Sequence, residues 1–292
     1  MHMLNLAHLY ESTARFTNAI SGHYPRNVKT LHSEYVKAIN TIRPSGLPAD
    51  LVGIKIGYED SGWAGHCKES GIFAHIVGPA TESDGPTREL WDAKVTSALD
   101  VIHRIHPDLR SMVDLLVTDI VVFNSGVDGG GSANQMPGVV LMSPGPEWSV
   151  LNYAQCIVHE GLHSGLFVLD TVYEMFTLPP AELEKEEYRA LSAVKIGQKR
   201  PLHAAFHAAA VAVPLMFMEH HEGGTELVGK YTDSMRDACT DMLSKRKYFT
   251  PYGQLLLDEM VAWVSKEPLD FEQVARALTS REYAGYRPAV PA

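Results

Sequence analysis

The spacing of apolar and polar residues changes near the middle of this chain. Before about residue 149, short runs rich in β-branched and aromatic residues alternate with amphipathic stretches, which indicates strands separated by helices. From Ser149 onward, apolar residues recur at helical spacing almost without interruption. A mixed sheet in the N-terminal half, followed by a mostly helical C-terminal half, is typical of an α+β fold, which we therefore predict.

Strands are predicted where short apolar runs stand between turn signals. The expected strands are residues 51–58, 71–77, 114–123 and 138–142, and the run 114–123 has the strongest strand signal in the chain. A glycine-rich loop is expected over residues 126–131, between the last two strands.

Helices are expected on both sides of these strands. In the N-terminal half they cover much of residues 1–45 and the segment 89–101. The helices predicted in the C-terminal half are 149–170, 181–195, 201–221, 225–244, 251–265 and 270–278. We expect one continuous domain, because no repeat or linker interrupts the chain. Within it, residues 1–110 form a helical and strand region that is a candidate for peptide recognition, and residues 111–292 form the catalytic region.

Charge and cysteine content exclude several classes of protein. The 292 residues carry a net charge of −10, and the longest basic run is Lys245-Arg246-Lys247, so we expect no nucleic-acid partner. The cysteines Cys67, Cys156 and Cys239 lie far apart and form no pair with metal-ligand spacing. Neither a disulfide framework nor a thiolate zinc site is indicated, which fits a reducing cytoplasm.

Neither an export signal nor a membrane span is predicted. The first residues lack a basic flank followed by an apolar run. The longest apolar run, Ala208 to Met218, has eleven residues and contains Pro214, whereas a span needs about 20. We therefore expect a cytoplasmic protein with no membrane partner.

The segment Val158-His159-Glu160-Gly161-Leu162-His163 is an H-E-x-x-H motif within the predicted helix 149–170. Residues four apart on a helix lie on one face, about one turn apart, so both imidazoles can reach one ion. The surrounding helix is apolar on most sides, which indicates burial. Polar groups buried without partners cost about 1–3 kcal/mol each, and a metal ion would satisfy both histidines. The sequence therefore predicts a metal site.

A second apolar helix, which begins after Arg200-Pro201-Leu202, has histidines with the same spacing, His203 and His207. It is the economical source of a third ligand. Taken alone, His203 and His207 are more often hydrogen-bonded core histidines than metal ligands, and an H-E-x-x-H string can also arise by chance.

A zinc peptidase is one interpretation of this motif. Glu160 would act as general base on a zinc-bound water, with His159 and His163 as ligands. The extended form with a third histidine six residues after the motif is missing, because Leu166, Leu169 and Asp170 follow instead. A glutamate ligand on the next helix remains open, since four glutamates lie between residues 182 and 187. A non-catalytic peptide-binding protein with a degenerate site is a further alternative.

Four blocks of this sequence resemble a known enzyme family. They are Ser132 to Pro144, Val158 to His163, Arg200 to His207, and Thr250 to Leu256. Their order is similar to that of the H-E-x-x-H peptide β-hydroxylases of ribosomal-peptide biosynthesis. The resemblance covers about residues 114–260. The Pro-Gly-apolar run and the Arg-Pro-Leu block favour this family, and Ala204 stands where the family usually has glycine.

The resemblance implies an iron(II) enzyme that uses 2-oxoglutarate and dioxygen to hydroxylate a side chain of a precursor peptide. Carried over to this chain, it implies that His159, His163 and His207 hold the iron. Glu160 would support these ligands, and Arg200 with His203 would bind the co-substrate or the peptide. Arg200 is the candidate cation for the distal carboxylate of 2-oxoglutarate, since guanidinium groups match carboxylates.

Two further polar residues follow the glycine-rich loop and precede the motif. Ser132 and Asn134 are candidates for hydrogen bonds to substrate or co-substrate, although turn chemistry explains both residues equally well.

Overall fold

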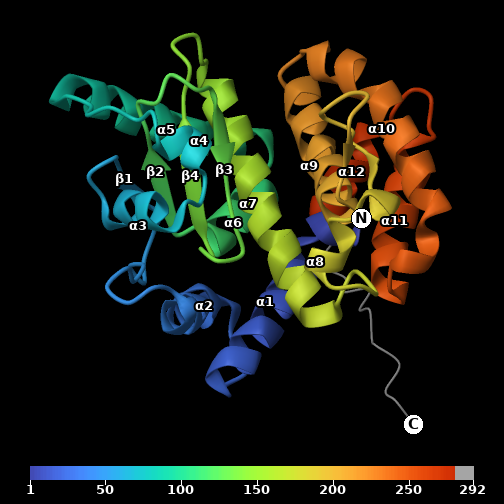
Figure 1. Cartoon of the computed structure of the whole chain (residues 1–292), viewed down its shortest axis with the longest axis horizontal. Helices are drawn as coiled ribbons and strands as arrows, with labels where there is room; N and C mark the ends of the chain where they lie inside the picture. The colour runs from blue at the N-terminus through green and yellow to red at the C-terminus, as the bar shows by residue number, and fades with distance from the viewer. Residues whose placement is uncertain (280–292) are drawn as a thin grey trace. The chain divides into compact units, whose positions relative to one another are not determined.

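A four-stranded sheet lies in the N-terminal half of the chain, and the C-terminal half is almost entirely helical (Figure 1). The computed structural model describes residues 1–279, and within them the predicted α+β class is confirmed. The chain divides into two compact units. The sheet unit is Thr13–Ser164, and the helical unit combines Met1–Ser12 with the described residues from Gly165 onward. The functional division expected near residue 110 stays a prediction.

The sheet combines three parallel strands with one antiparallel edge strand. The parallel strands are β1 (Lys55–Gly57), β2 (Asp119–Val122) and β4 (Val139–Ser143). The edge strand β3 (Gly129–Gly131) pairs antiparallel with β4, so that the order across the sheet is β1-β2-β4-β3 (Figure 1). Every residue of β2 and β4 is buried, as is usual for strands covered on both faces.

Helices of the sheet unit begin and end at identifiable signals. The Ser61 and Asp84 side chains accept hydrogen bonds from backbone N–H groups of the first turns of α3 and α5, respectively. Gly71 ends α3 in the left-handed conformation that favours glycine. The helices are α2 (Val28–Ile42), α3 (Gly62–Ser70), α4 (Ala74–Val77), α5 (Gly85–Ile105) and α6 (Pro107–Leu116). Two more, α1 (Leu6–Ser21) and α7 (Val150–Tyr173), have residues in both units.

Different helices cover the two faces of the sheet. On one face, Val121, Val139 and Leu141 pack in a single cluster with residues of α3 and α4. The opposite face meets α7, because Gly130, which pairs with Met142, lies close to side chains of that helix. The sheet therefore fixes the position of the helix that carries the H-E-x-x-H motif.

The helical unit is built around α9 (Leu202–His221), in which Leu202 and every residue from Ala205 to Glu219 are buried. Among the described residues, α9 is the one helix long and apolar enough to cross a membrane, and 89% of its apolar window is buried inside the fold. The other elements of this unit are η1 (His2–Leu4), α8 (Pro180–Leu183), η2 (Glu186–Tyr188), β5 (Ala190–Leu191), β6 (Lys199–Arg200), α10 (Glu226–Ser244), η3 (Arg246–Tyr248), α11 (Pro251–Val264) and α12 (Phe271–Thr279).

Two expected elements are wrong. Residues 71–77 form a turn followed by the short helix α4 instead of a strand, because Gly71 and Phe73 both adopt left-handed conformations. Residues 181–195 do not form one helix: α8 ends at Leu183, and the extended backbone of Lys185 starts a 3-10 turn and then the two-stranded β5–β6 sheet. The glycine loop 126–131 also differs from expectation, since its second half is the strand β3.

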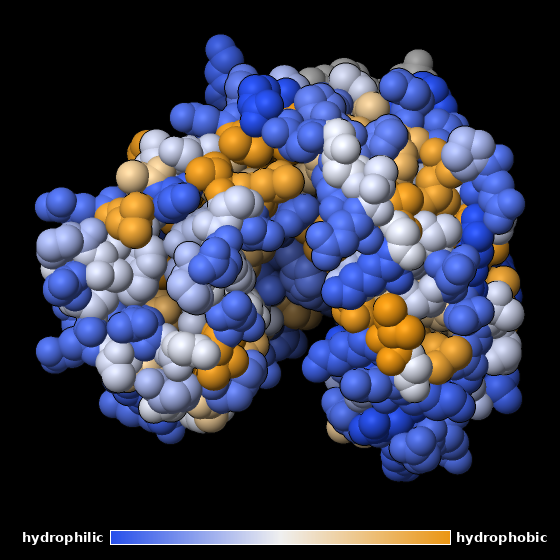
Figure 2. Space-filling model, turned by 90° about the horizontal axis from the view of Figure 1, so that it is seen from above, coloured by the Kyte–Doolittle hydropathy of each residue, from blue (hydrophilic) through white to orange (hydrophobic). Residues whose placement is uncertain are grey.

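On the face that Figure 2 shows, apolar side chains form several separate patches among hydrophilic ones. Among residues 1–279, the most exposed large apolar side chain is Val52, which is 86% exposed, followed by Val28 and Ile196. Single exposed apolar side chains are ordinary on protein surfaces and need no special explanation.

Candidate metal centre

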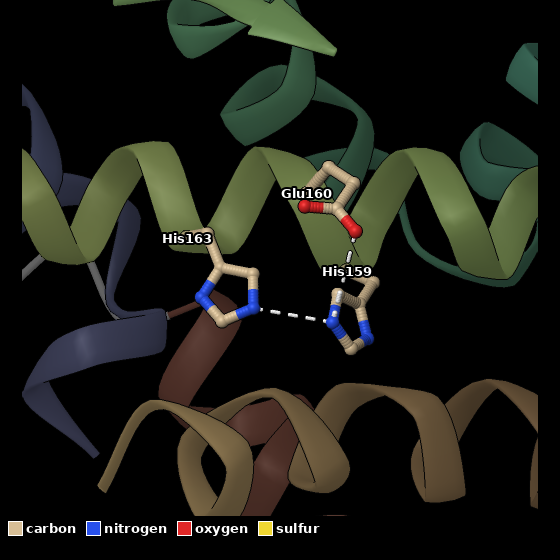
Figure 3. Close-up of side chains that lie close together, drawn as sticks. All are labelled: His159, Glu160 and His163. Atoms are coloured by element: carbon tan, nitrogen blue, oxygen red, sulfur yellow. Dashed lines mark hydrogen bonds and ion pairs between the residues drawn. The ribbon is translucent and has the colours of Figure 1, made fainter. Parts of the chain in front are cut away.

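His159 and His163 project from the same side of α7 (Figure 3). Their Nε2 atoms lie 3.1 Å apart, and their rings meet edge to face with centroids separated by 4.8 Å. The arrangement follows from helical geometry, because residues four apart stand one turn apart on one face. The H-E-x-x-H spacing therefore brings the two nitrogens together as the sequence predicted.

Glu160 leaves the same helix in a different direction and is only 5% exposed. Its Oε2 atom accepts a hydrogen bond of 2.6 Å from the Ser132 hydroxyl, and its Oε1 atom lies 3.8 Å from Nε2 of His159. One ligand atom from each of His159, Glu160 and His163 lies within 4.8 Å of the others. These three residues form a group of side chains that could hold a metal ion.

Burial sets the acidity of Glu160. Loss of solvation around the carboxylate raises its pKa to about 7, against the lowering effect of the hydrogen bond from Ser132. A carboxyl with a pKa near neutral pH exchanges protons readily under physiological conditions, which suits a general acid or base.

The edge strand β3 approaches α7 so closely at Gly130 that a side chain there would force its neighbours to shift. A Cβ atom at Gly130 would lie 2.6 Å from Sγ of Cys156 and 3.1 Å from Oε1 of Glu160. On the other face, a Cβ atom at Gly131 would lie 2.5 Å from the ring of Phe73. Glycine in a strand often marks such close approach. Ser132 follows directly, and its side chain reaches Glu160 because the strand holds it beside the helix.

The two imidazoles fit a divalent metal ion. The two Nε2 atoms lie 3.1 Å apart. One ion can therefore lie about 2.0–2.1 Å from both of them, which is the usual Zn–N distance. A direct hydrogen bond between the rings would instead require one Nε2 atom to be protonated and the other not. Both rings are partly exposed, so an ion has access to them from solvent.

Three of the other predicted site residues, Arg200, His203 and His207, lie in the helical unit. Arg200 ends β6 directly before Pro201, and α9 then carries His203 and His207 one turn apart. Arg200 is half-buried, and among residues 1–279 no carboxylate lies within ion-pair distance of its guanidinium. Loss of solvation lowers the pKa of Arg200. An unpaired, partly desolvated guanidinium is a favourable partner for an anion.

The two histidines of α9 differ in their surroundings. Nδ1 of His203 is buried and makes no hydrogen bond within the described chain, and its Nε2 atom lies 3.9 Å from Oε1 of Glu184. Burial lowers the pKa of His207 to about 3, and the nearby His203 and Arg200 add to this effect. His207 is therefore neutral at physiological pH, the form in which imidazole binds metals.

The structure thus gathers four of the predicted residues, His159, Glu160, His163 and Ser132, within the sheet unit. Ser132 contacts Glu160, so its hydroxyl supports the carboxylate. Asn134 is exposed in the turn after β3, and its predicted role stays a prediction. The role of His207 as a third ligand, and those of Arg200 and His203, also stay predictions.

The sequence alone did not reveal the role of Gly130, where an added Cβ would meet both Cys156 and Glu160. The three consecutive glycines were the available signal, and a loop was the simpler interpretation of them.

Comparison with known proteins adds no assignment, since no protein-family model matches this chain and no curated protein matches it.

Proposed function

We propose that this protein is a metal-dependent enzyme in which His159 and His163 hold a divalent ion. The observation that carries this proposal is the 3.1 Å separation of their Nε2 atoms on a helix whose neighbouring carboxylate is buried. Metal-binding histidines commonly work beside such a supporting or proton-transferring carboxylate.

For the reaction, we propose iron(II)- and 2-oxoglutarate-dependent hydroxylation of a peptide side chain. The resemblance of the four sequence blocks to peptide β-hydroxylases supports this reaction. The guanidinium of Arg200, which has no carboxylate partner among residues 1–279, supports binding of a dicarboxylate co-substrate. Bound iron would supply the oxidation: one oxygen atom of O2 enters a substrate C–H bond, the other enters succinate, and CO2 leaves.

The residues of the chain have separate tasks in this proposal. His159 and His163 bind the ion through Nε2. Glu160 holds a negative charge or a proton beside them, since its pKa is about 7. The Ser132 hydroxyl fixes the orientation of this carboxylate by donating to Oε2. Arg200 would bind the distal carboxylate of 2-oxoglutarate, with His203 beside it.

Metal content tests the first part of the proposal. The full chain, loaded anaerobically with iron(II) and desalted, should retain about one ion per chain. The His159→Ala and His163→Ala variants should retain far less, while His103→Ala, which removes an exposed histidine of α5, should match the parent chain. Equal retention by all four proteins would rule out this site.

Succinate formation tests the second part. The iron-loaded chain should convert 2-oxoglutarate to succinate in air when a randomised peptide library is present, and the library should gain 16 mass units. His159→Ala should form no succinate above background. An iron-loaded parent chain that forms neither succinate nor oxidised peptide would overturn the hydroxylase assignment.

A zinc-dependent peptidase is the second candidate. The favouring observation is Glu160, whose carboxylate has a pKa of about 7 and lies 3.8 Å from Nε2 of His159, a suitable place for a general base. Zinc-loaded protein would then generate new peptide N-termini from the same library without 2-oxoglutarate. Cleavage by the zinc form that Glu160→Gln abolishes, together with no succinate from the iron form, would select the peptidase.

A further inference from the structure

The hydrogen bonds of the sheet determine which way the main chain of β4 points. The backbone N–H groups of Asp119 and Phe123 donate to the carbonyls of Gly138 and Met142, respectively. In a strand, the N–H and C=O of one residue point to the same side, and successive residues point to alternate sides. The main-chain N–H and C=O groups of residues 138, 140 and 142 therefore point toward β2. Those of Leu141 and Ser143 point toward β3.

The register of β3 then places the main chain of Gly130 on the outer edge. Gly129 lies opposite Ser143 and Gly131 lies opposite Leu141, so these two glycines make the hydrogen-bonded pairs with β4. Gly130, between them, directs its N–H and C=O away from the sheet. Because β3 is the last strand in the sheet order, no other strand of residues 1–279 pairs with this edge.

The same residue lies beside the proposed metal site. The side-chain direction of Gly130 points at α7, where an added Cβ would lie 3.1 Å from Oε1 of Glu160. That oxygen is 3.8 Å from Nε2 of His159. Residues directly opposite one another on neighbouring strands place their side chains on the same face of a sheet. A strand added outside β3 would therefore present the side chain opposite Gly130 to the α7 face.

We propose that the outer edge of β3 binds the peptide substrate as an extended fifth strand. The main-chain N–H and C=O of Gly130 would make the hydrogen bonds, as in other cases of strand addition to a free sheet edge. The residue opposite Gly130 would be the one presented to Glu160, and its two neighbours would face the side of the sheet on which Phe73 lies. The identity of this strand as the substrate rests on the proposed function.

Main-chain recognition of this kind depends little on peptide sequence, so a mixture of sequences is a suitable probe. The probe is a synthetic library of nonapeptides with every position randomised. Its matched control is the same library with every amide nitrogen methylated, which keeps the side chains and removes the N–H donors of the added strand. Substituting Gly130 itself would be a poor test, because any side chain there would displace Glu160 or Cys156.

Amide hydrogen exchange of the full-length chain, resolved to single residues, is the measurement. The unmethylated library should slow exchange at Gly130 about tenfold or more, and the methylated library should leave it unchanged. Gly131 is an internal reference, since its amide already faces β4. Exchange at Gly130 that the unmethylated library does not alter, or that both libraries slow equally, would overturn the proposal.

This readout needs no turnover, so it separates the two proposals. Protection of Gly130 without succinate formation by the iron-loaded chain would support strand docking and overturn the hydroxylase function. Succinate formation with oxidised peptide, but without protection of Gly130, would support the function and overturn the docking mode.

Discussion

The Ser132 hydroxyl donates a hydrogen bond of 2.6 Å to Oε2 of Glu160. Ser132 directly follows the edge strand β3, whereas Glu160 belongs to α7. The bond therefore links the strand to the helix at the carboxylate that lies beside the imidazoles of His159 and His163. It favours the ionised carboxylate and so opposes the effect of burial on the pKa of Glu160.

Removal of this hydroxyl should make Glu160 a weaker acid. In Ser132→Ala, the pKa of Glu160 is expected to rise above its value of about 7, because burial then acts without the opposing hydrogen bond. A ¹³C NMR titration of the glutamate carboxyl groups in the metal-free protein measures this change. Ser132→Thr keeps the hydroxyl and should titrate like the parent chain. A lower pKa in the alanine variant would contradict this role for Ser132.

The raised pKa of Glu160 also makes the stability of the metal-free protein depend on pH. The folded chain holds this proton up to about pH 7, whereas the unfolded chain releases it near the ordinary value of 4.5. The folded state binds more protons between these values, so the free energy of unfolding falls as pH rises through this window and stays low above it.

Glu160→Gln should abolish this dependence. Because the two pKa values differ by about 2.5 units, the variant should be more stable than the parent chain by up to roughly 3 kcal/mol at pH 8, and by little at pH 4. Urea unfolding at several pH values measures the difference. Glu89→Gln, at an exposed position of α5, is the control. A stability difference that is the same at pH 4 and pH 8 would argue against a buried, protonated Glu160.

Arg200 should affect the binding of 2-oxoglutarate more than the stability of the fold. Its half-buried guanidinium has no carboxylate partner within residues 1–279, so Arg200→Met removes a partly desolvated charge without breaking an ion pair. The melting temperature should stay unchanged or rise. The KM for 2-oxoglutarate should increase by about 10- to 100-fold, the size expected for a lost charged hydrogen bond of roughly 1.5–3 kcal/mol.

Lys199→Met is the matched control for Arg200, since it removes an exposed cation from the neighbouring position of β6. It should leave the KM for 2-oxoglutarate unchanged. Equal effects of the two substitutions on KM would assign the change to net charge and remove Arg200 from the co-substrate site.

Gly131 and Phe73 should be energetically coupled. A Cβ atom at Gly131 would lie 2.5 Å from the Phe73 ring, so Gly131→Ala forces this ring to move and should cost about 1–3 kcal/mol of unfolding free energy. In a background that already carries Phe73→Ala, the same substitution should cost much less, because the obstructing ring is gone. Chemical denaturation of the four proteins gives the coupling energy. If the effects of the two substitutions on the unfolding free energy simply add, the Phe73 ring does not restrict the side chain at position 131.

The close approach of the two imidazoles could be predicted from sequence because its geometry is local. His159 and His163 stand on one continuous helix with strong apolar periodicity, and helical spacing alone brings their nitrogens together. The bond from Ser132 to Glu160 joins residues 28 positions apart, and only the fold brings them into contact. Local patterns contain no such information.

The errors in the secondary structure predicted from sequence have a related cause. β3 consists only of glycines, which have little intrinsic tendency to form strands, and pairing with β4 makes it a strand. Residues 71–77 contain the apolar residues typical of a strand, yet Ile76 and Val77 are buried equally well from the short helix α4. In both segments tertiary contacts override the local preference.

Both imidazole nitrogens of the candidate metal site come from one helix, so their spacing can be transferred to another protein, whereas the acidity of Glu160 cannot. A designed bundle that received residues 156–163 in a buried helix would inherit the imidazole spacing from helical pitch. It would lack the strand that supplies the Ser132 hydroxyl, and its glutamate would titrate according to the new host. A designed site that reproduces this carboxylate environment therefore needs the strand as well as the helix.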